Sequence, residues 1–289
     1  MIKKGIILAG GKGTRMSPLT KAVNKQLLPL YDKPLIFYPL SVLMLAGIRK
    51  ILIIVNKGQL NEFRKLLPEK NNLGLSIEYK EQPNPGGLPQ AFTIGEKFIG
   101  KDNISLILGD NFFYGQSLTK ILKKNIKLKS GAKIFIHPVK KPQLFGVVTL
   151  NKNKKVINLK EKPKNSRSNL AVTGLYFFDN KVIELTKKLK PSKRGELEII
   201  DLLNFYKRKN KLKAEFIGRG GSWLDTGSIN DFYDASNYIS TIENRQGLKI
   251  ACIEEIAFKN GWISEKEIIK SINFYGNCEY SKYLKSLIS

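Results

Sequence analysis

The sequence predicts an α/β fold: a mixed, mainly parallel β-sheet between two layers of helices, with a helical extension at the C-terminus. Three patterns indicate this fold. Short apolar runs alternate with helical patterns over residues 1–130, as in strand–helix units joined by right-handed crossovers. Strand-like segments then follow one another as far as residue 178, and the residues beyond about 230 have mainly helical patterns. The parallel part of the sheet is therefore expected first.

The strand–helix units begin with Lys4–Ala9, an apolar run that ends in glycine and is typical of a buried parallel strand. A helix is expected over Pro34–Ala46, with proline in its first turn and Gly47 past its end. The units then continue with strand Ile51–Val55, helix Leu60–Leu67, strand Leu75–Tyr79, helix Leu88–Phe98, strand Ile104–Leu108 and helix Ser117–Leu128.

Beyond residue 130, β-branched and aromatic residues predict consecutive strands. These strands are Ala132–Val139, Phe145–Leu150, Val156–Lys160 and Leu170–Phe178. Helices follow at Val182–Leu189 and Glu196–Lys209, and a further strand at Leu212–Ile217. We expect one catalytic domain at residues 1–240 and a C-terminal helical extension at 241–289 packed on it.

The composition is that of an ordinary globular protein, with 289 residues, 42% of them hydrophobic and 26% charged. The two cysteines, Cys252 and Cys278, form no CxxC pair, so we expect a reducing, cytoplasmic setting and no cysteine zinc site. No apolar run is long enough to span a bilayer, so no membrane association is expected. The one histidine, His137, lies in an apolar run. Histidine-dependent catalysis is therefore excluded, and a bound metal should have oxygen ligands, which indicates Mg²⁺.

The net charge of +26 raises the alternative of a nonenzymatic polyanion binder. Of the 50 basic residues, however, only eight are arginines, and the lysines are spread over the whole chain. Nucleic-acid-binding proteins usually concentrate basic residues on one face. We therefore expect a solvated basic surface and no nucleic-acid partner, although the charge can attract small polyanionic substrates.

A glycine-rich turn after the first strand is the clearest candidate site. It reads Gly10-Gly11-Lys12-Gly13-Thr14-Arg15. Such a turn lets backbone N–H groups approach an anion, and an arginine there can bind phosphate oxygens; a plain tight turn is the alternative. A second cation, Lys25, is followed by Gln26 in the same connection. Two cations can stabilise a departing pyrophosphate, although Lys25 alone could be a surface lysine.

Acidic residues end three later segments. Asp110 follows a buried strand, where the carboxyl ends of strands line the ligand crevice, and Asp225 is its expected partner in holding Mg²⁺. Either aspartate could instead cap the helix that follows it. Glu161 and Lys162 close another strand and suit a sugar phosphate, by accepting hydroxyl hydrogen bonds and by neutralising the phosphate. An exposed turn is the alternative there.

These segments together resemble a known family. The strings KGIILAGGKGTR, NKQLLPLYDKP, LILGDN, FGVV, LKEKP, AVTGLYFFD, RGELEI, WLDTG and ENRQGLK occur in this order. Over essentially the whole chain they resemble the bacterial glucose-1-phosphate thymidylyltransferases (dTDP-glucose pyrophosphorylases) of the sugar nucleotidyltransferase superfamily. The resemblance implies a Rossmann-like, three-layer fold of the nucleotide-diphospho-sugar transferase type.

The resemblance also implies an activity: Mg²⁺-dependent transfer of a thymidylyl group from dTTP to glucose 1-phosphate, giving dTDP-glucose and pyrophosphate. In this family it is the first step of dTDP-rhamnose and dTDP-deoxysugar synthesis. A uridylyltransferase that uses UTP is the alternative. A homotetramer, built as a dimer of dimers, is implied as well.

Site residues follow from the matching positions. Arg15, Lys25 and Lys162 would be catalytic, and Asp110 with Asp225 would hold Mg²⁺. The substrates would be bound by these residues and by Leu8, Gly10, Gly11, Gly13, Thr14, Gln26, Gln82, Gly87, Gly146, Glu161, Val172, Tyr176, Arg194 and Glu196. Gln82 would bind the pyrimidine edge of the nucleotide.

A second, regulatory nucleotide site between subunits is implied by the resemblance alone. Its residues would be Tyr114, Gly115, Arg219, Glu255 and Ile256. The chain departs from the family pattern at Lys12, Phe145, Gly86, Pro89 and Lys259. These positions bear on the phosphate turn, the sugar pocket, the nucleotide loop and feedback by dTDP-rhamnose.

Overall fold

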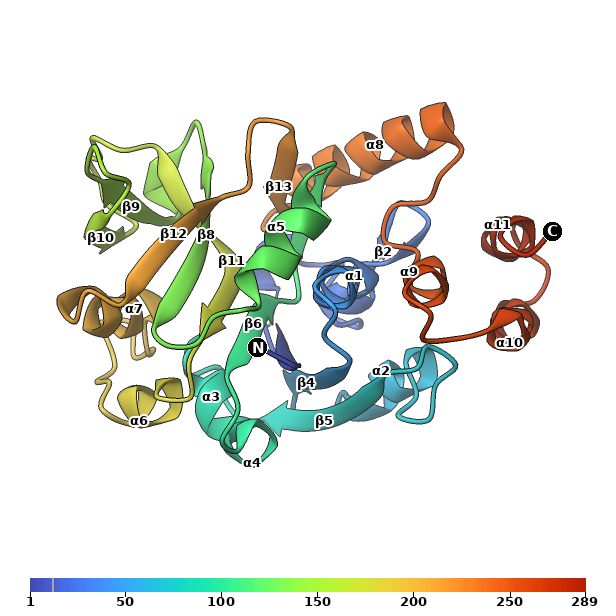
Figure 1. Cartoon of the computed structure of the whole chain (residues 1–289), viewed down its shortest axis with the longest axis horizontal. Helices are drawn as coiled ribbons and strands as arrows, with labels where there is room; N and C mark the ends of the chain where they lie inside the picture. The colour runs from blue at the N-terminus through green and yellow to red at the C-terminus, as the bar shows by residue number, and fades with distance from the viewer. Residues whose placement is uncertain (12) are drawn as a thin grey trace.

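A nine-stranded mixed sheet forms the centre of the computed structural model, which describes residues 1–11 and 13–289 (Figure 1). Its parallel part has the order β6-β1-β4-β5. These strands are β1 (Lys4–Ala9), β4 (Lys50–Asn56), β5 (Ser76–Gln82) and β6 (Ile104–Leu108). The predicted parallel sheet is therefore confirmed, strand by strand.

The second half of the sheet is largely antiparallel. Strand β11 (Leu170–Phe178) pairs antiparallel with β6, with β8 (Ala132–Pro138) and with β9 (Gly146–Leu150). Strand β10 (Val156–Glu161) pairs antiparallel with β9. Strand β12 (Leu212–Phe216) pairs parallel with β8. The sheet is thus mixed, as expected, and β11 joins its two halves.

Helices cover both faces of the sheet because each strand alternates its apolar side chains between two cores. In β1, Ile7 belongs to the core under one helix layer and Ile6 to the core under the other. The first layer contains α1 (Phe37–Leu45) and α5 (Leu118–Asn125). The opposite layer contains α3 (Gln90–Ile94), α4 (Glu96–Ile99), α6 (Val182–Lys187) and α7 (Ile199–Arg208). Helix α2 (Leu60–Leu66) lies beside β5.

One predicted helix is wrong in its extent. The segment Leu88–Phe98 forms two short helices, α3 and α4, that meet at Gly95. A Cβ at Gly95 would lie 2.9 Å from the carbonyl oxygen of Ala91 and 3.0 Å from the Ile6 side chain. The backbone at Gly95 therefore passes so close to the sheet that a larger residue has no room. The other predicted helices and strands are present, with small shifts at their ends.

Four short strands were absent from the predictions. Strands β2 (Pro29–Leu30) and β3 (Lys33–Pro34) form a hairpin. Strands β7 (Asn111–Gly115) and β13 (Gly221–Asp225) form an antiparallel pair beside the main sheet. Residues 111 and 225 are neighbours in this pair, so it joins two distant parts of the chain at the edge of the site.

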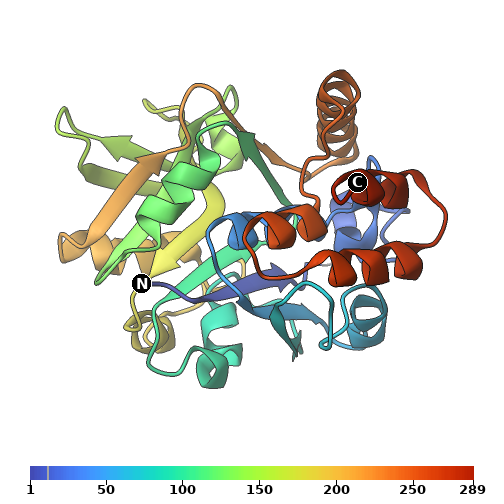
Figure 2. The ribbon, with the colours of Figure 1, turned by 45° about the vertical axis from the view of Figure 1, so that its right-hand side comes forward.

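The C-terminal part is helical, as predicted. It consists of α8 (Ile229–Gln246), α9 (Ile253–Lys259), α10 (Glu265–Tyr275) and α11 (Glu279–Ser286). Helix α9 packs on α1, and Figures 1 and 2 place α9, α10 and α11 at the side of the molecule away from β9 and β10. The expected domain division at residue 240 falls within α8. Among the residues described, no helix has the length and apolar character needed to cross a membrane.

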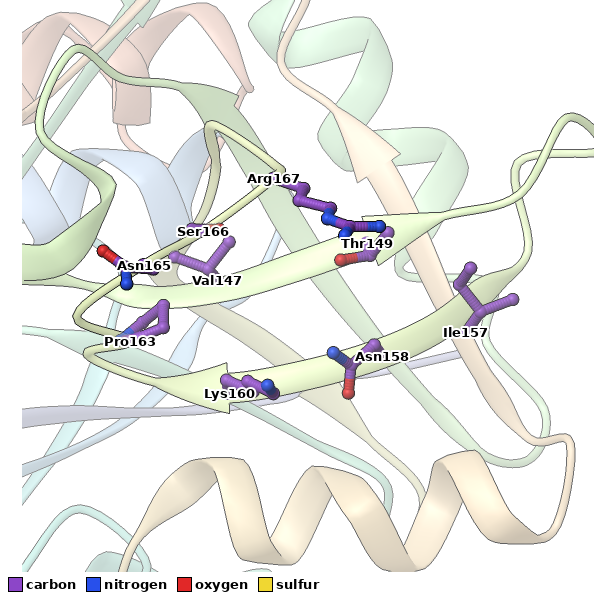
Figure 3. Close-up of a pocket in the computed structure, with 9 residues that line it drawn as sticks. All are labelled: Val147, Thr149, Ile157, Asn158, Lys160, Pro163, Asn165, Ser166 and Arg167. Atoms are coloured by element: carbon purple, nitrogen blue, oxygen red, sulfur yellow. The ribbon is translucent and has the colours of Figure 1, made fainter.

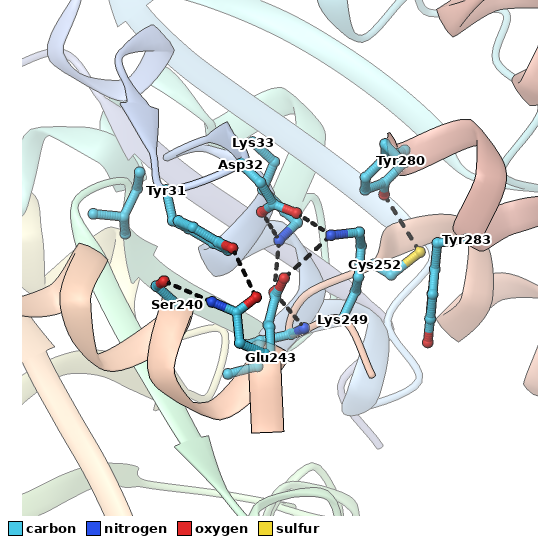
Figure 4. Close-up of polar contacts among 12 residues, drawn as sticks. Tyr31, Asp32, Lys33, Ser240, Glu243, Lys249, Cys252, Tyr280 and Tyr283 are labelled. Atoms are coloured by element: carbon cyan, nitrogen blue, oxygen red, sulfur yellow. Dashed lines mark hydrogen bonds and ion pairs between the residues drawn. The ribbon is translucent and has the colours of Figure 1, made fainter. Parts of the chain in front are cut away.

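A buried charge network fixes the β2–β3 hairpin to the C-terminal helices (Figure 4). Lys33 Nζ donates to Glu243 Oε1 of α8 at 2.9 Å, and the Lys33 and Glu243 side chains are only 2% and 4% exposed. Asp32 pairs with both Lys33 and Lys249. The backbone N–H of Ile250 also donates to Glu243 Oε1, at 2.8 Å. The network therefore joins residues 32–33 to residues 243–250.

Candidate active site

Two adjoining cavities open at the carboxyl ends of β1 and β6. The first, here called the glycine-turn cavity, has a volume of about 230 Å³. It is lined by Leu8, Gly10, Gly11, Gln26, Gln82, Pro85, Gly87, Leu88, Leu108, Asp110 and Glu196. Parallel sheets bind ligands at this edge. All but three of these lining residues are predicted site residues.

The second, here called the β11 cavity, has a volume of about 180 Å³. Its lining includes seven predicted site residues: Arg15, Asp110, Gly146, Glu161, Val172, Tyr176 and Asp225. The two cavities share Leu88, Leu108 and Asp110. Asp110 therefore lies where an occupant of one cavity would meet an occupant of the other.

Lys25 is part of the site framework and is not a surface lysine. It begins the 3₁₀ helix η2 (Lys25–Leu27), which is capped by the Asn24 side chain accepting from the Gln26 N–H at 2.8 Å. Its side chain is 5% exposed, and Nζ lies 2.8 Å from Asp110 Oδ2. Burial acts to raise the pKa of Asp110, but the charge of Lys25 and three hydrogen bonds, from Lys25, Asn111 and the Asp110 backbone, hold that pKa below its usual value. Asp110 is therefore a carboxylate at neutral pH.

Asp225 lies beside Asp110 through the pairing of β13 with β7. The Thr226 N–H and hydroxyl both donate to the Asp110 carbonyl oxygen, at 3.1 and 3.0 Å. Burial, then the charges of Asp231 and Asp110, raises the pKa of Asp225 to about 6. Neither aspartate caps a helix: Asp110 precedes β7, and α8 is capped by Ser228. The capping alternatives are therefore wrong.

Arg15 lines the same cavity as Asp110 and Asp225, although it is distant from both in the sequence. It lies in η1 (Thr14–Met16), directly after the glycine turn. A Cβ placed on Gly227 would lie 3.0 Å from both Arg15 Nη2 and Asp225 Oδ2. The guanidinium and the Asp225 carboxylate thus border a single small space. The expected convergence of Arg15, Asp110 and Asp225 is confirmed, whereas Lys12 of the turn lies outside the described residues.

Asn111 is a buried site residue that sequence reasoning missed. Its Oδ1 accepts from Trp223 Nε1 at 2.5 Å and from the Gly174 N–H at 3.1 Å, and its Nδ2 donates to Asp110 Oδ1 at 3.0 Å. A Cβ on Gly174 would lie 2.6 Å from Asn111 Oδ1, so only glycine permits this approach, at an irregularity in β11. Its place next to Asp110 in the LGDN string was the available signal.

Glu161 carries the acidic side of the β11 cavity. Burial, then the nearby Glu198 carboxylate, raises the pKa of Glu161, and Arg194 Nη2 lies 3.9 Å from Glu161 Oε1. Arg194 itself pairs with Glu198 at 2.8 Å. Lys162 follows Glu161, but its side chain is exposed and lines neither cavity. Gly13, Thr14, Lys25 and Arg194 likewise line neither cavity.

Another hollow, of about 460 Å³, contains none of the predicted site residues. It lies over β9 and β10 and the loop that follows them (Figure 3). The register pairs Val147 with Lys160 and Gly146 with Glu161. Since neighbouring side chains in a strand point to opposite faces, Lys160 faces this hollow while Glu161 faces the β11 cavity. The same two strands therefore separate it from the site.

A further cavity of about 380 Å³ lies between α1, β7, α5 and α9. It is lined by four of the five residues expected at a regulatory site, Tyr114, Gly115, Glu255 and Ile256, but not by Arg219. Lys259 lines it too and pairs with Glu255 at 2.5 Å.

The chain is similar to known proteins over most of its length. A family model described as nucleotidyl transferase matches residues 4–242. The glucose-1-phosphate thymidylyltransferase of Neisseria meningitidis serogroup A / serotype 4A is 50% identical over 285 residues, which cover 99% of each chain. The protein of that name from Mycobacterium tuberculosis strain H37Rv is 44% identical, again over 99% of each chain.

Solved structures share the fold. One, described provisionally as a glucose-1-phosphate thymidylyltransferase from Bacillus anthracis, has a TM-score of 0.75 at 38% identity and covers 81% of this chain and 94% of its own. A UDP-glucose pyrophosphorylase complexed with UDP-glucose has a TM-score of 0.72 at 27% identity and covers 84% of this chain and 100% of its own. The chain therefore belongs to the nucleotidyl transferase family, among the glucose-1-phosphate thymidylyltransferases.

Proposed function

We propose that this enzyme transfers the thymidylyl group of dTTP to glucose 1-phosphate, giving dTDP-glucose and pyrophosphate. The observation that carries the proposal is the meeting of two cavities at Asp110, with Arg15, Lys25 and Asp225 around the junction. A reaction between two anions needs such a place, where both substrates are aligned and their charges neutralised. Full-length relatives named for this reaction support the choice of substrates.

In this proposal, dTTP occupies the glycine-turn cavity and glucose 1-phosphate the β11 cavity. A phosphate oxygen of the sugar phosphate attacks the α-phosphorus in line, and pyrophosphate leaves. Arg15 binds the triphosphate and stabilises the charge that builds up on the departing pyrophosphate. Lys25 adds positive charge behind Asp110, and Lys162 neutralises the sugar phosphate from the rim. No covalent enzyme intermediate is needed.

Asp110 and Asp225 are the residues that would hold Mg²⁺. Both are oxygen donors, and the raised pKa of Asp225 shows that the protein alone leaves its negative charge poorly compensated. No group of three His, Cys, Asp or Glu side chains able to hold a metal occurs in the described ranges. Two carboxylates, with substrate oxygens and water, are a usual ligand set for Mg²⁺. When bound, the ion would neutralise triphosphate oxygens.

The residues of the β11 cavity can bind the hydroxyl groups of a sugar. Glu161 can accept hydrogen bonds from the glucose hydroxyls, and partial burial raises its pKa. Tyr176 and Val172 supply the apolar wall, and Gly146 lies beside Glu161. Arg194 and Glu196 would complete the binding of substrates from the segment before α7.

Pyrophosphate release from dTTP plus glucose 1-phosphate, with and without Mg²⁺, tests the proposal. We expect release only when both substrates and the metal are present. Competition between dTTP and UTP tests the nucleotide, because a structural neighbour binds UDP-glucose; a strong preference for UTP would make the protein a uridylyltransferase. Absence of release with either nucleotide, together with tight and steeply salt-dependent binding of DNA or RNA, would favour the polyanion binder instead.

We further propose a cytoplasmic homotetramer, a dimer of dimers, that performs the first step of dTDP-rhamnose or dTDP-deoxysugar synthesis. The cavity that contains Tyr114, Gly115, Glu255 and Ile256 would be its regulatory site, and Arg219 would contribute to it. Light scattering of the purified protein tests the assembly. Inhibition of pyrophosphate release by dTDP-rhamnose tests the regulatory site.

A further inference from the structure

We infer that Gln90 determines nucleotide specificity by fixing the orientation of the Gln82 side chain. The inference rests on the proposed function and deepens it, since it concerns how the glycine-turn cavity distinguishes one pyrimidine from another. Gln82 ends β5, is 4% exposed and lines this cavity. Gln90 begins α3, next to the loop that carries Gly86 and Gly87.

The orientation of Gln90 follows from a backbone group. The Gly86 N–H donates to the Gln90 side chain at 2.9 Å. A backbone N–H can only donate, so the atom that it contacts must be the amide oxygen, Oε1. The same Oε1 lies 2.6 Å from Gln82. An oxygen without a proton can only accept there, so Gln82 must present its nitrogen, Nε2, to Gln90.

The oxygen of Gln82 is thereby directed to the other side. A Cβ on Gly10 would lie 2.2 Å from Gln82 Oε1, so this oxygen rests against the glycine turn, where only glycine leaves room for it. No described residue donates a hydrogen bond to Gln82 Oε1, although Gln82 and Gly10 line the same cavity. Gln82 therefore offers the ligand a fixed acceptor.

A fixed acceptor discriminates among pyrimidines. Thymine and uracil carry an N–H at ring position 3, which can donate to Gln82 Oε1. Cytosine has a lone pair at that position, so two acceptors would face each other at a buried side chain. If the Gln82 amide were free to turn over, its nitrogen could donate to cytosine and much of this discrimination would be lost. Gln90 acts through Gln82 and is a positioning residue.

Gln90→Met tests the inference, because methionine has a similar size but accepts only weakly. We expect the ratio of kcat/KM for dTTP to kcat/KM for CTP to fall at least about tenfold, the equivalent of one buried hydrogen bond. Gln90→Glu is the matched control: its carboxylate accepts from both Gly86 and Gln82, so the ratio should stay near that of the wild type. A loss of packing alone would lower both rates together and leave the ratio unchanged.

A second variant reaches the same contact from the other side. A Cβ at Gly86 would lie 2.9 Å from Gln90 Oε1, so Gly86→Ala should displace Gln90 and lower the ratio as well. It replaces Gln90→Met if that variant does not fold. An unchanged dTTP/CTP ratio in whichever of the two variants folds, with an active wild type, would overturn the inference while the proposed function stands. A wild type that releases no pyrophosphate from dTTP or UTP would overturn both.

Discussion

Asn111 gives the sharpest test of how the site is built, because its side chain joins three elements. It accepts from Trp223 of β13 and from the backbone of Gly174 in β11, and it donates to Asp110. The side chain is buried, with 2% of its surface exposed. Asn111→Leu, which keeps the branched shape of the side chain, removes all three hydrogen bonds and leaves two buried donors without a partner.

The stability loss can be worked out from those donors. Each buried donor left unpaired costs roughly 1–3 kcal/mol, so two cost about 3 kcal/mol. With an unfolding entropy of about 2.1 cal/mol/K per residue, a chain of this length loses about 5 °C in melting temperature. Asp110 also loses the N–H that orients it. For the proposed role of Asp110 as a metal ligand, loss of this partner should lower activity about 10–100-fold.

Asn111→Asp distinguishes the contribution of Asn111 to stability from its hydrogen bond to Asp110. Its carboxylate still accepts from Trp223 and Gly174, so the melting temperature should fall less than in Asn111→Leu. It also places a second negative charge against Asp110, so pyrophosphate release should fall at least as far. Thermal unfolding and steady-state pyrophosphate release measure the two effects. If the Asp variant is both more stable and more active than the Leu variant, or if Asn111→Leu melts within about 1 °C of the wild type, the reasoning is wrong.

Three further predictions concern charge. Arg15→Ala should lower kcat at least ~100-fold, about 2.7 kcal/mol of barrier, whereas Arg208→Ala, an exposed arginine on α7, should leave it unchanged; a variant that keeps most of its turnover would remove Arg15 from the mechanism. The raised pKa of Asp225 means that the folded chain holds the Asp225 proton more tightly than the unfolded chain does. Protonation of Asp225 therefore stabilises the fold fully below about pH 4, and this stabilisation is lost as the pH rises through about 6. Mg²⁺ should therefore raise the melting temperature at pH 8 and not at pH 5, and Asp225→Asn should raise the metal-free melting temperature at pH 8 and abolish the Mg²⁺ effect; equal Mg²⁺ stabilisation at both pH values would contradict this. Lys33→Met should destabilise the protein by up to about 3–5 kcal/mol, because it removes the more deeply buried of the two lysines that pair with Glu243 and leaves only Lys249, at 3.3 Å. The double variant with Glu243→Leu should recover most of the lost free energy of unfolding, as measured by chemical denaturation. If the double variant recovers none of it, the two residues act separately.

The parallel half of the fold could be predicted because its signals are local. Lys4–Ala9 and Ile104–Leu108 are continuous apolar runs that end in glycine, and both form strands where expected. The glycine break between α3 and α4 could not be predicted, because Gly95 lies against Ile6 of β1, which is distant in the sequence. Strands β7 and β13 were missed for a similar reason: each is short and is stable only through pairing with a segment about 110 residues away.

The candidate site, too, could be predicted from the sequence only in part. Arg15, Asp110 and Asp225 could be nominated because chemistry-bearing residues at strand ends and glycine turns have few other uses there. For Asn111 the only signal in the sequence was its place beside Asp110, and Gln90 had none, since an asparagine or a glutamine becomes informative mainly when its partners are known. Their signals lie in distances, such as the 2.6 Å between Gln82 and Gln90, and not in residue type.

The pairing of Lys25 with Asp110 explains how so charged a site can be stable before it holds substrate. A lysine that is 5% exposed would be costly to bury alone, and Asp110 compensates it at 2.8 Å. In the proposed reaction, Asp110 turns to a divalent cation and Lys25 to a phosphate, so each charge gains a partner as it gives one up. Both charged side chains therefore already lie at the junction of the two cavities, and it is their partners that change when the substrates arrive.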